Sequence, residues 1–150
     1  MNYALDCRHY NDAAGKVRWE NCTLRSWLNQ DFYNTAFDAG ERQRLSPRTA
    51  GVPEDRFWLL SANEAKNGYA CLKDNDARMC APTKFAVSHG AYTDLFNTVD
   101  GEGACWWWLR SLASDSNAPD VEADDLVSLT GFSAVNEKGG VRPVICVKPS

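Results

Sequence analysis

Cys105-Trp106-Trp107-Trp108-Leu109-Arg110 is the stretch of sequence that decides the fold. Its compact run of aromatic and apolar residues predicts a short buried strand. Because successive side chains of a strand point to opposite faces, Trp106 and Trp108 should face one way and Trp107 the other. We expect one face of this strand to lie in the core and the other to lie under a loop.

The chain before this strand has the pattern of helices. Apolar residues recur at spacings of three to five over residues 18–50, which predicts helix with Asn21 as a candidate N-cap and an end near Pro47. Residues 56–60 read as a short buried strand, and 61–64 form a capping box for a short helix that Gly68 closes. Another helix is expected from about Pro82 to residues 89–90.

Strand patterns dominate after residue 104, up to a final apolar run at 141–147 that contains Pro143. Helices first and strands later predict an α+β fold, with N-terminal helices packed on short antiparallel sheets. The length of 150 residues fits one domain, 1–150. We expect the core to include Trp27, Trp58, Trp106 or Trp108, and Ile145, and the inward-facing residues to include Val121, Val127, Val135 and Val141.

Composition and charge exclude several classes of protein. No apolar run approaches the ~18 residues of a membrane-spanning helix, and residues 1–8 lack the pattern of a signal peptide. The net charge is −4, and residues 114–139 carry six acids against one base. A basic stripe of the kind that binds nucleic acid is absent from the sequence, and the local acidity indicates a local surface feature.

Candidate catalytic and metal-binding groups are sparse. The six cysteines include no C-x-x-C pair, so buried thiols are the favoured interpretation, with a disulfide or a four-thiolate metal site as alternatives. Asp120, Glu122 and Asp124 alternate and could share a strand face around a cation, but we favour a solvated acidic edge strand. His89 sits at a predicted helix C-terminus, and this position favours an interaction of its side chain with the helix dipole over a role as a catalytic base. We therefore expect no cofactor, no metal site and no catalytic residue.

Several blocks together resemble a bacterial and phage family, a domain of unknown function. They are residues 3–7 (YALDC), 19–29 (WxxCTLRxWLN), 32–37 (FYNTAF), 74–78 (DNDAR), 105–111 (CWWWLRS) and 140–143 (GVRP). That family is similar to the C-type-lectin-like fold, which is also the fold of the formylglycine-generating enzyme and of the variable proteins of diversity-generating retroelements. Family members usually begin earlier, with a strand pair before YALDC, so this chain is expected to lack that pair.

The resemblance implies a non-enzymatic display module whose ligand surface is the segment 114–138. In the family this segment varies around a fixed frame, which matches here as Val121, Val127, Gly131 and Val135. The implied ligand-binding residues are Ser114, Asp115, Asn117, Asp120, Glu122, Ser128, Leu129, Thr130, Phe132, Ser133, Asn136, Glu137 and Lys138. We expect Asp120, Glu122, Phe132, Asn136 and Glu137 to be exposed together, with Phe132 as the anchor.

The implied partner is a protein or glycan on another cell or host, with no nucleic acid and no membrane insertion, and the implied location is a cell or virion surface within a larger assembly. One alternative is an enzyme like the formylglycine-generating enzyme, for which Cys105 and Cys146 are the candidate copper ligands. A structural domain of a larger surface protein is the other. Calcium-lectin signatures are absent from the sequence, so calcium-dependent sugar binding is not expected.

Overall fold

The tryptophan run lies at the centre of the main sheet. The computed structural model describes residues 2–48, 54–74, 76–111 and 116–149. Strand β7 (Trp107–Trp108) is the middle strand of a five-stranded sheet with the order β2-β10-β7-β8-β9. Its neighbours are β2 (Asp6–Cys7), β10 (Gly140–Val141), β8 (Asn117–Val121) and β9 (Val127–Ser133). The pair β10–β7 is parallel and the other three pairs are antiparallel.

The alternation predicted for the three tryptophans is confirmed. Trp106 and Trp108 belong to one buried apolar cluster, and Trp107 belongs to a second cluster on the opposite face of the sheet. All three side chains are buried. The second face therefore packs on further core residues, among them Leu60 and Leu72, rather than only on a loop.

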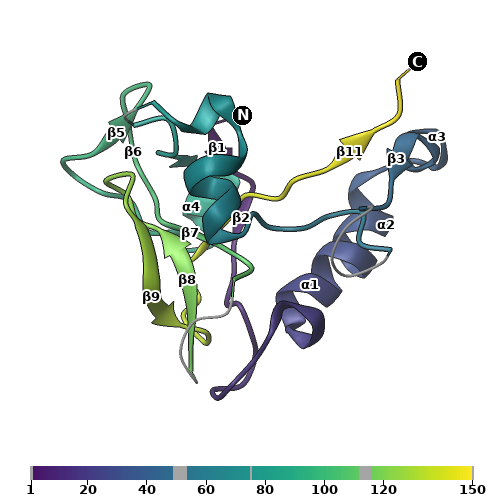
Figure 1. The fold of residues 1–150 in the computed structure, drawn as a ribbon, viewed down its shortest axis with the longest axis horizontal. Coiled ribbons are helices and arrows are strands. Elements are labelled where there is room, and N and C mark those ends of the chain that lie inside the picture. Colours follow the sequence, from purple (N-terminus) through teal and green to yellow (C-terminus); the bar gives the residue numbers. More distant parts are fainter. Residues whose placement is uncertain (1, 49–53, 75, 112–115, 150) are drawn as a thin grey trace.

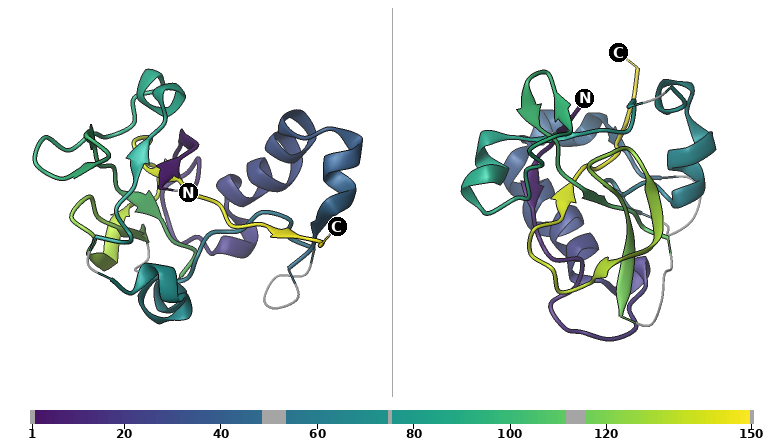
Figure 2. Two further views of the ribbon diagram at one scale, coloured as in Figure 1. Left: turned by 90° about the horizontal axis from the view of Figure 1, so that it is seen from above. Right: turned by 90° about the vertical axis from the view of Figure 1, so that its left-hand side faces the viewer.

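The N-terminal helices form one side of the molecule, to the right of the sheet in Figure 1. A 3₁₀ turn (Trp19–Asn21) leads into α1 (Thr23–Trp27), which continues through a π-helical turn (Leu28–Phe32) into α2 (Tyr33–Ala36). Helix α3 (Ala39–Arg44) follows and ends at β3 (Leu45–Ser46). The C-terminal segment crosses from the sheet to this side, where β11 (Cys146–Val147) pairs with β3, as Figures 1 and 2 show.

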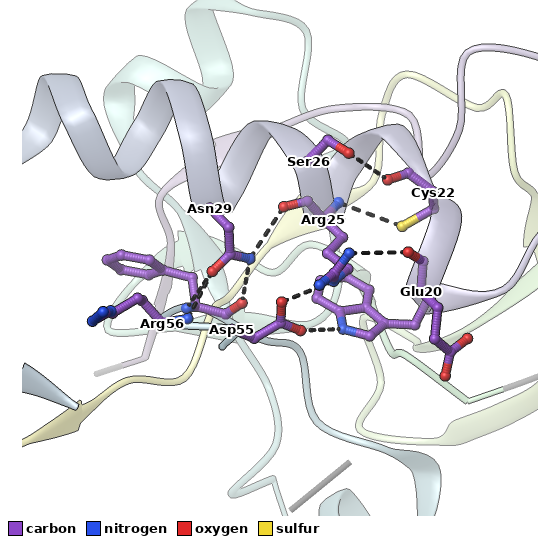
Figure 3. A network of polar contacts seen from close by, with 9 residues as sticks. Glu20, Cys22, Arg25, Ser26, Asn29, Asp55 and Arg56 are labelled. Carbon is purple, nitrogen blue, oxygen red and sulfur yellow. Dashed lines mark hydrogen bonds and ion pairs between the residues drawn. The ribbon is translucent and has the colours of Figure 1, made fainter. Parts of the chain in front are cut away.

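A buried polar network ties α1 to the chain at residues 55–57 (Figure 3). The carboxylate of Asp55 accepts hydrogen bonds from Trp19 Nε1 at 2.9 Å and from Arg25 Nε at 2.8 Å. The Asn29 side chain accepts from the backbone N–H of Arg56 and Phe57 and donates to the Phe57 carbonyl. The block at residues 19–29 therefore serves to hold the helical side on the core, and its polar members have structural partners.

The middle of the chain forms short elements over the second cluster. Ser61 and Glu64 make the predicted capping box reciprocally, and a π-helical turn (Glu64–Gly68) ends at the expected glycine. It is followed by a 3₁₀ turn (Ala70–Leu72), β4 (Ala81–Pro82), which pairs with β1 (Tyr3–Ala4), and helix α4 (Lys84–Ser88). A hairpin of β5 (Thr98–Val99) and β6 (Glu102–Gly103) precedes the tryptophan run.

Two of the strands predicted from the sequence are not continuous in the structure. Residues 56–60 contribute only a bridge from Trp58 to Val144, and the run 141–147 is divided between β10 and β11. The chain leaves the main sheet after Val141, so Ile145 is exposed, contrary to expectation. Trp58 is buried as predicted, whereas Trp27 is half-buried under the Arg8 guanidinium, which lies 3.9 Å from its ring. Cys22, and not Asn21, caps α1.

The architecture is mixed α+β, as the order of patterns predicted, with the helices beside small sheets. Within the described residues, no helix has the length and apolar character needed to cross a bilayer.

Candidate binding pocket

A pocket of about 350 Å³ opens between the β8–β9 hairpin and the loop that precedes β5. We call it the Trp106 pocket. Figure 1 places these two segments side by side at the edge of the sheet, and three chain segments far apart in sequence supply the lining. The lining residues are Tyr92, Asp94, Asn97, Trp106, Glu122, Ala123, Asp124, Phe132, Asn136 and Lys138.

The loop at residues 92–97 is held by the side chain of Asp94. One carboxylate oxygen accepts from the backbone N–H of Phe96 and Asn97, both at 2.8 Å, and the other accepts from the hydroxyl of Tyr92 at 2.9 Å. A short backbone ladder fixes the loop to the strand that leads to Trp106, because Asp94 N–H donates to Ala104 and Ala104 N–H donates to Asn97. The loop thus presents Tyr92 and Asp94 to the pocket in a fixed geometry.

The opposite wall is the tight turn between β8 and β9. Glu122 N–H donates to the Leu126 carbonyl at 2.8 Å, and Asp124 caps the turn by accepting from Leu126 N–H at 3.2 Å. Asp125 has a positive φ of 78° and points away to Arg78, with which it forms a partly buried ion pair. The turn therefore leaves Glu122 and Asp124 on the pocket side.

The floor is aromatic. The rings of Trp106 and Phe132 lie 4.3 Å apart between centroids at an interplanar angle of 35°. Two glycines make this arrangement possible. Gly131 has φ of 56°, and a Cβ there would lie 1.8 Å from the Ala118 carbonyl oxygen, at the bulge beside Phe132. A Cβ on Gly139 would lie 2.7 Å from the Trp106 ring and 2.1 Å from Trp108 Nε1.

The electrostatic character of the Trp106 pocket is acidic. Three carboxylates line it against one base, Lys138. Hydrogen bonds from the backbone of Asn97 and Phe96 lower the pKa of Asp94, so this carboxylate is ionised at neutral pH. The hydrogen bond to Asp94 raises the pKa of Tyr92, which keeps its hydroxyl protonated. Within the described chain, no ion pair joins Lys138 to these carboxylates.

Asp120 is the clearest departure from the expected surface. It was predicted to be exposed, but it is fully buried in β8, between β7 and β9. Neither of its carboxylate oxygens has a hydrogen-bond partner among the described residues. Burial, assisted by the nearby charge of Glu122, raises the pKa of Asp120 to about 7. Because β8 is an inner strand, the acidic-edge interpretation of Asp120, Glu122 and Asp124 is also wrong.

The predicted ligand-binding residues divide into four groups, of which the first is the buried Asp120 alone. Those that line the Trp106 pocket are Glu122, Phe132, Asn136 and Lys138. Those outside it but at least partly exposed are Asn117, Ser128, Leu129, Thr130, Ser133 and Glu137. Ser114 and Asp115 lie outside the described residues.

Two of the partly exposed residues have roles within the hairpin. The Asn117 amide donates to the carbonyls of Thr130 and Gly131, and Ser128 Oγ accepts from Gly131 N–H. Of the four valines predicted to face inward, Val121 and Val141 are buried and Val127 packs on the second cluster, but Val135 is exposed. Ala134, after the bulge, takes the inward position instead. Its N–H donates to the Ser116 carbonyl and its carbonyl accepts from the Asn11 N–H.

Sequence reasoning missed the contribution of the 92–97 loop. Tyr92, Asp94 and Asn97 lie outside the acidic segment, and their meeting with it depends on long-range packing. Trp106 was predicted as core, and it serves both as core and as floor, since it is buried yet lines the pocket. The spacing Tyr92-x-Asp94-x-x-Asn97 predicts a side-chain-capped turn at most, so no local signal identifies these residues as part of a site.

The cysteines and histidines are placed away from this pocket. Cys80 and Cys105 are buried free cysteines of the second cluster, and their backbones form an isolated antiparallel β-bridge. Cys146 is exposed on β11, which pairs with β3 in a separate sheet. His89 ends α4, and its Nδ1 lies 3.0 Å from the buried carboxylate of Asp6. Among the described residues, no cluster of three or more His, Cys, Asp or Glu side chains has a geometry that could hold a metal ion.

Comparison with known families confirms the resemblance to a family of unknown function. The family profile described as "Domain of unknown function (DUF6273)" matches residues 1–149. No curated protein and no solved structure shows significant similarity to the chain.

Proposed function

This chain belongs to the DUF6273 family, and from that premise we propose that it is a non-enzymatic binding module whose ligand site is the Trp106 pocket. The observation that carries the proposal is the convergence of Glu122, Phe132, Asn136 and Lys138 with the 92–97 loop in one pocket. A pocket with an aromatic floor and a few placed polar groups is the usual form of a ligand site. Its side chains contain carboxylates, amides, a phenol and an amine, without a paired nucleophile and base.

We further propose that the fold is C-type-lectin-like and that the segment 114–138 is diversified. The β8–β9 hairpin and the residues after it support the diversification, because they separate two kinds of position. Ala118, Val121 and Gly131 set the geometry of the hairpin. The exposed positions are Leu129, Thr130, Ser133 and Glu137. Side chains of the second kind can change without disturbing the core. Asp120 is excluded from the proposed display surface by its burial. The proposed ligand is a protein or glycan on another cell or host, met at a cell or virion surface.

Binding to peptide and glycan arrays tests the function directly. The wild-type chain should bind a restricted set of array members, and a Phe132→Ser, Asn136→Ser variant should lose them while retaining its melting temperature within a few degrees. Phe85→Ser is the matched control, since Phe85 is an exposed phenylalanine on α4 that does not line the Trp106 pocket. Binding that survives the double substitution, or is lost equally in the control, would contradict the proposal.

Diversification has its own test in natural sequences. Copies of the gene from independent isolates should differ mainly at exposed positions of 114–138, through changes at adenines, and should retain Val121, Gly131 and Val141. A uniform distribution of differences over the chain would contradict diversification while leaving the binding function intact.

A further inference from the structure

We propose that the Trp106 pocket recognises a cationic side chain, an arginine or lysine, of a partner polypeptide whose apolar neighbours pack on Leu95 and Phe96. This inference rests on the proposed binding function and specifies its ligand. Three aromatic residues and three carboxylates line one pocket of about 350 Å³, and the group that complements both is an organic cation.

The aromatic part favours an organic cation. Tyr92, Trp106 and Phe132 approach the pocket from the loop, the sheet and the hairpin. The face of an aromatic ring carries negative electrostatic potential, so it attracts guanidinium and alkylammonium groups within about 6 Å of the ring centroid. The chain already uses this contact elsewhere, because Arg8 lies over Trp27 at 3.9 Å and Arg142 lies over Trp107 at 4.9 Å.

The carboxylates supply the complementary charge. Asp94 is fixed by hydrogen bonds from Phe96, Asn97 and Tyr92, so it adds a negative charge that needs no rearrangement on binding. Glu122 and Asp124 stand on the opposite wall, in a turn closed by backbone hydrogen bonds. A cation entering between the walls meets carboxylates from both sides, which favours arginine because its planar guanidinium can bond to carboxylates and stack on rings together.

The surroundings of the pocket favour a polypeptide as the source of the cation. Leu95 and Phe96 belong to the same loop as Tyr92 and Asp94, and their side chains are 87% and 91% exposed. Two consecutive large apolar side chains that are exposed beside a charged pocket are typical of a protein-binding surface. A peptide with apolar residues next to its basic residue would cover both side chains while the basic group enters the Trp106 pocket.

The experiment uses a fluorescent pentapeptide with one arginine between two leucines, titrated with the complete chain. A matched peptide carries citrulline, which has the shape of arginine without its charge, and a third carries glutamate. We expect the arginine peptide to bind about tenfold more tightly than the citrulline peptide, the glutamate peptide not to bind, and the affinity for arginine to fall as salt is raised. Equal binding of the arginine and citrulline peptides, or no binding of the arginine peptide at millimolar concentration, overturns the inference.

Charge variants separate a specific pocket from general attraction. Asp124→Asn keeps the acceptor for Leu126 N–H but removes a pocket charge, so it should weaken arginine binding several-fold. Glu137→Gln removes an exposed charge of the same segment that does not line the pocket, and it should have little effect. Lys138→Gln removes the base of the pocket and should strengthen binding. Equal effects of Asp124→Asn and Glu137→Gln would overturn the inference.

Failure of this inference and failure of the proposed function are distinguishable. If array ligands are lost in Phe132→Ser, Asn136→Ser but are neutral glycans or acidic peptides, the binding function stands and the cation specificity is wrong. If the arrays give no ligand that depends on Phe132 and Asn136, the function itself fails.

Discussion

The indole ring of Trp106 and the phenyl ring of Phe132 lie 4.3 Å apart between centroids, and they join the core to the surface of the pocket. Trp106 is buried, whereas Phe132 is among the exposed large hydrophobic residues. The pair thus divides two tasks that the sequence places 26 positions apart along the printed chain. One ring supports the fold, and the other covers it while remaining open to a ligand.

This division predicts unequal costs of truncation. Trp106→Ala should lower the free energy of unfolding by about 3–5 kcal/mol, because it removes a buried aromatic side chain. Phe132→Ala should cost about 1–2 kcal/mol, since it loses the ring contact of a side chain that is only partly buried. Urea denaturation followed by circular dichroism measures both, and equal costs would show that Phe132 is a core residue.

Asp120 predicts a pH dependence of stability with a definite sign. Its pKa is raised to about 7 in the folded chain, against an ordinary value of about 3.9 when unfolded. Between about pH 4 and pH 7 the folded state therefore holds more protons than the unfolded state, so the free energy of unfolding should fall as pH rises through this window. Asp120→Asn should remove this fall and stabilise the chain at pH 8 by about 2–4 kcal/mol.

Asp124→Asn is the control for that measurement, because Asp124 is exposed and lies four positions after Asp120 in the same segment. Melting temperatures of the wild type and both variants across about pH 4–8 give the comparison. A wild-type stability that rises with pH, or an Asp120→Asn variant with the wild-type profile, would contradict the burial of an unpartnered carboxyl group.

Gly131 predicts a large effect from the smallest possible side chain. Gly131→Ala places a Cβ 1.8 Å from the Ala118 carbonyl oxygen and forces a positive φ on alanine, so the bulge cannot persist unchanged. We expect a loss of at least about 2–3 kcal/mol. Gly15→Ala is the matched control, because Gly15 also has positive φ but has no atom within 4 Å of a Cβ. Thermal unfolding should give a clearly smaller loss for the control.

The cysteines predict two classes of reactivity in the folded chain. Cys71 and Cys146 are exposed and should react readily with iodoacetamide, whereas Cys7, Cys22, Cys80 and Cys105 are buried. Burial also raises the pKa of Cys22 to about 12, and the neighbouring Cys80 thiol together with burial raises the pKa of Cys105. Since the thiolate is the reactive form, Cys22 and Cys105 should be protected by both effects. The hydrogen bond with Cys105 lowers the pKa of Cys80, so the protection expected for Cys80 comes from its burial alone.

Mass spectrometry after timed alkylation counts the modified thiols. Two rapid additions are expected in the native chain and six in denaturant. Rapid modification of Cys80 or Cys105 without unfolding would show that the second cluster opens.

Local patterns in the sequence determined the elements that depend on near neighbours. The capping box of Ser61 and Glu64 could be predicted because both partners lie within one turn of the chain, and the alternation of Trp106, Trp107 and Trp108 follows from strand geometry alone. The α+β order followed for the same reason. The family resemblance predicted the segment 114–138 as the ligand surface, and four of its residues line the Trp106 pocket.

Tertiary structure decided everything that depends on which segments meet. Burial of Asp120 follows from the position of β8 between two strands, and the inward turn of Ala134 in place of Val135 follows from the bulge at Gly131. The pocket itself forms only because long-range packing brings the loop of Asp94 against the hairpin. A sequence specifies local periodicity directly, but a pocket is a relation between distant segments, and its chemistry is set when packing chooses their neighbours.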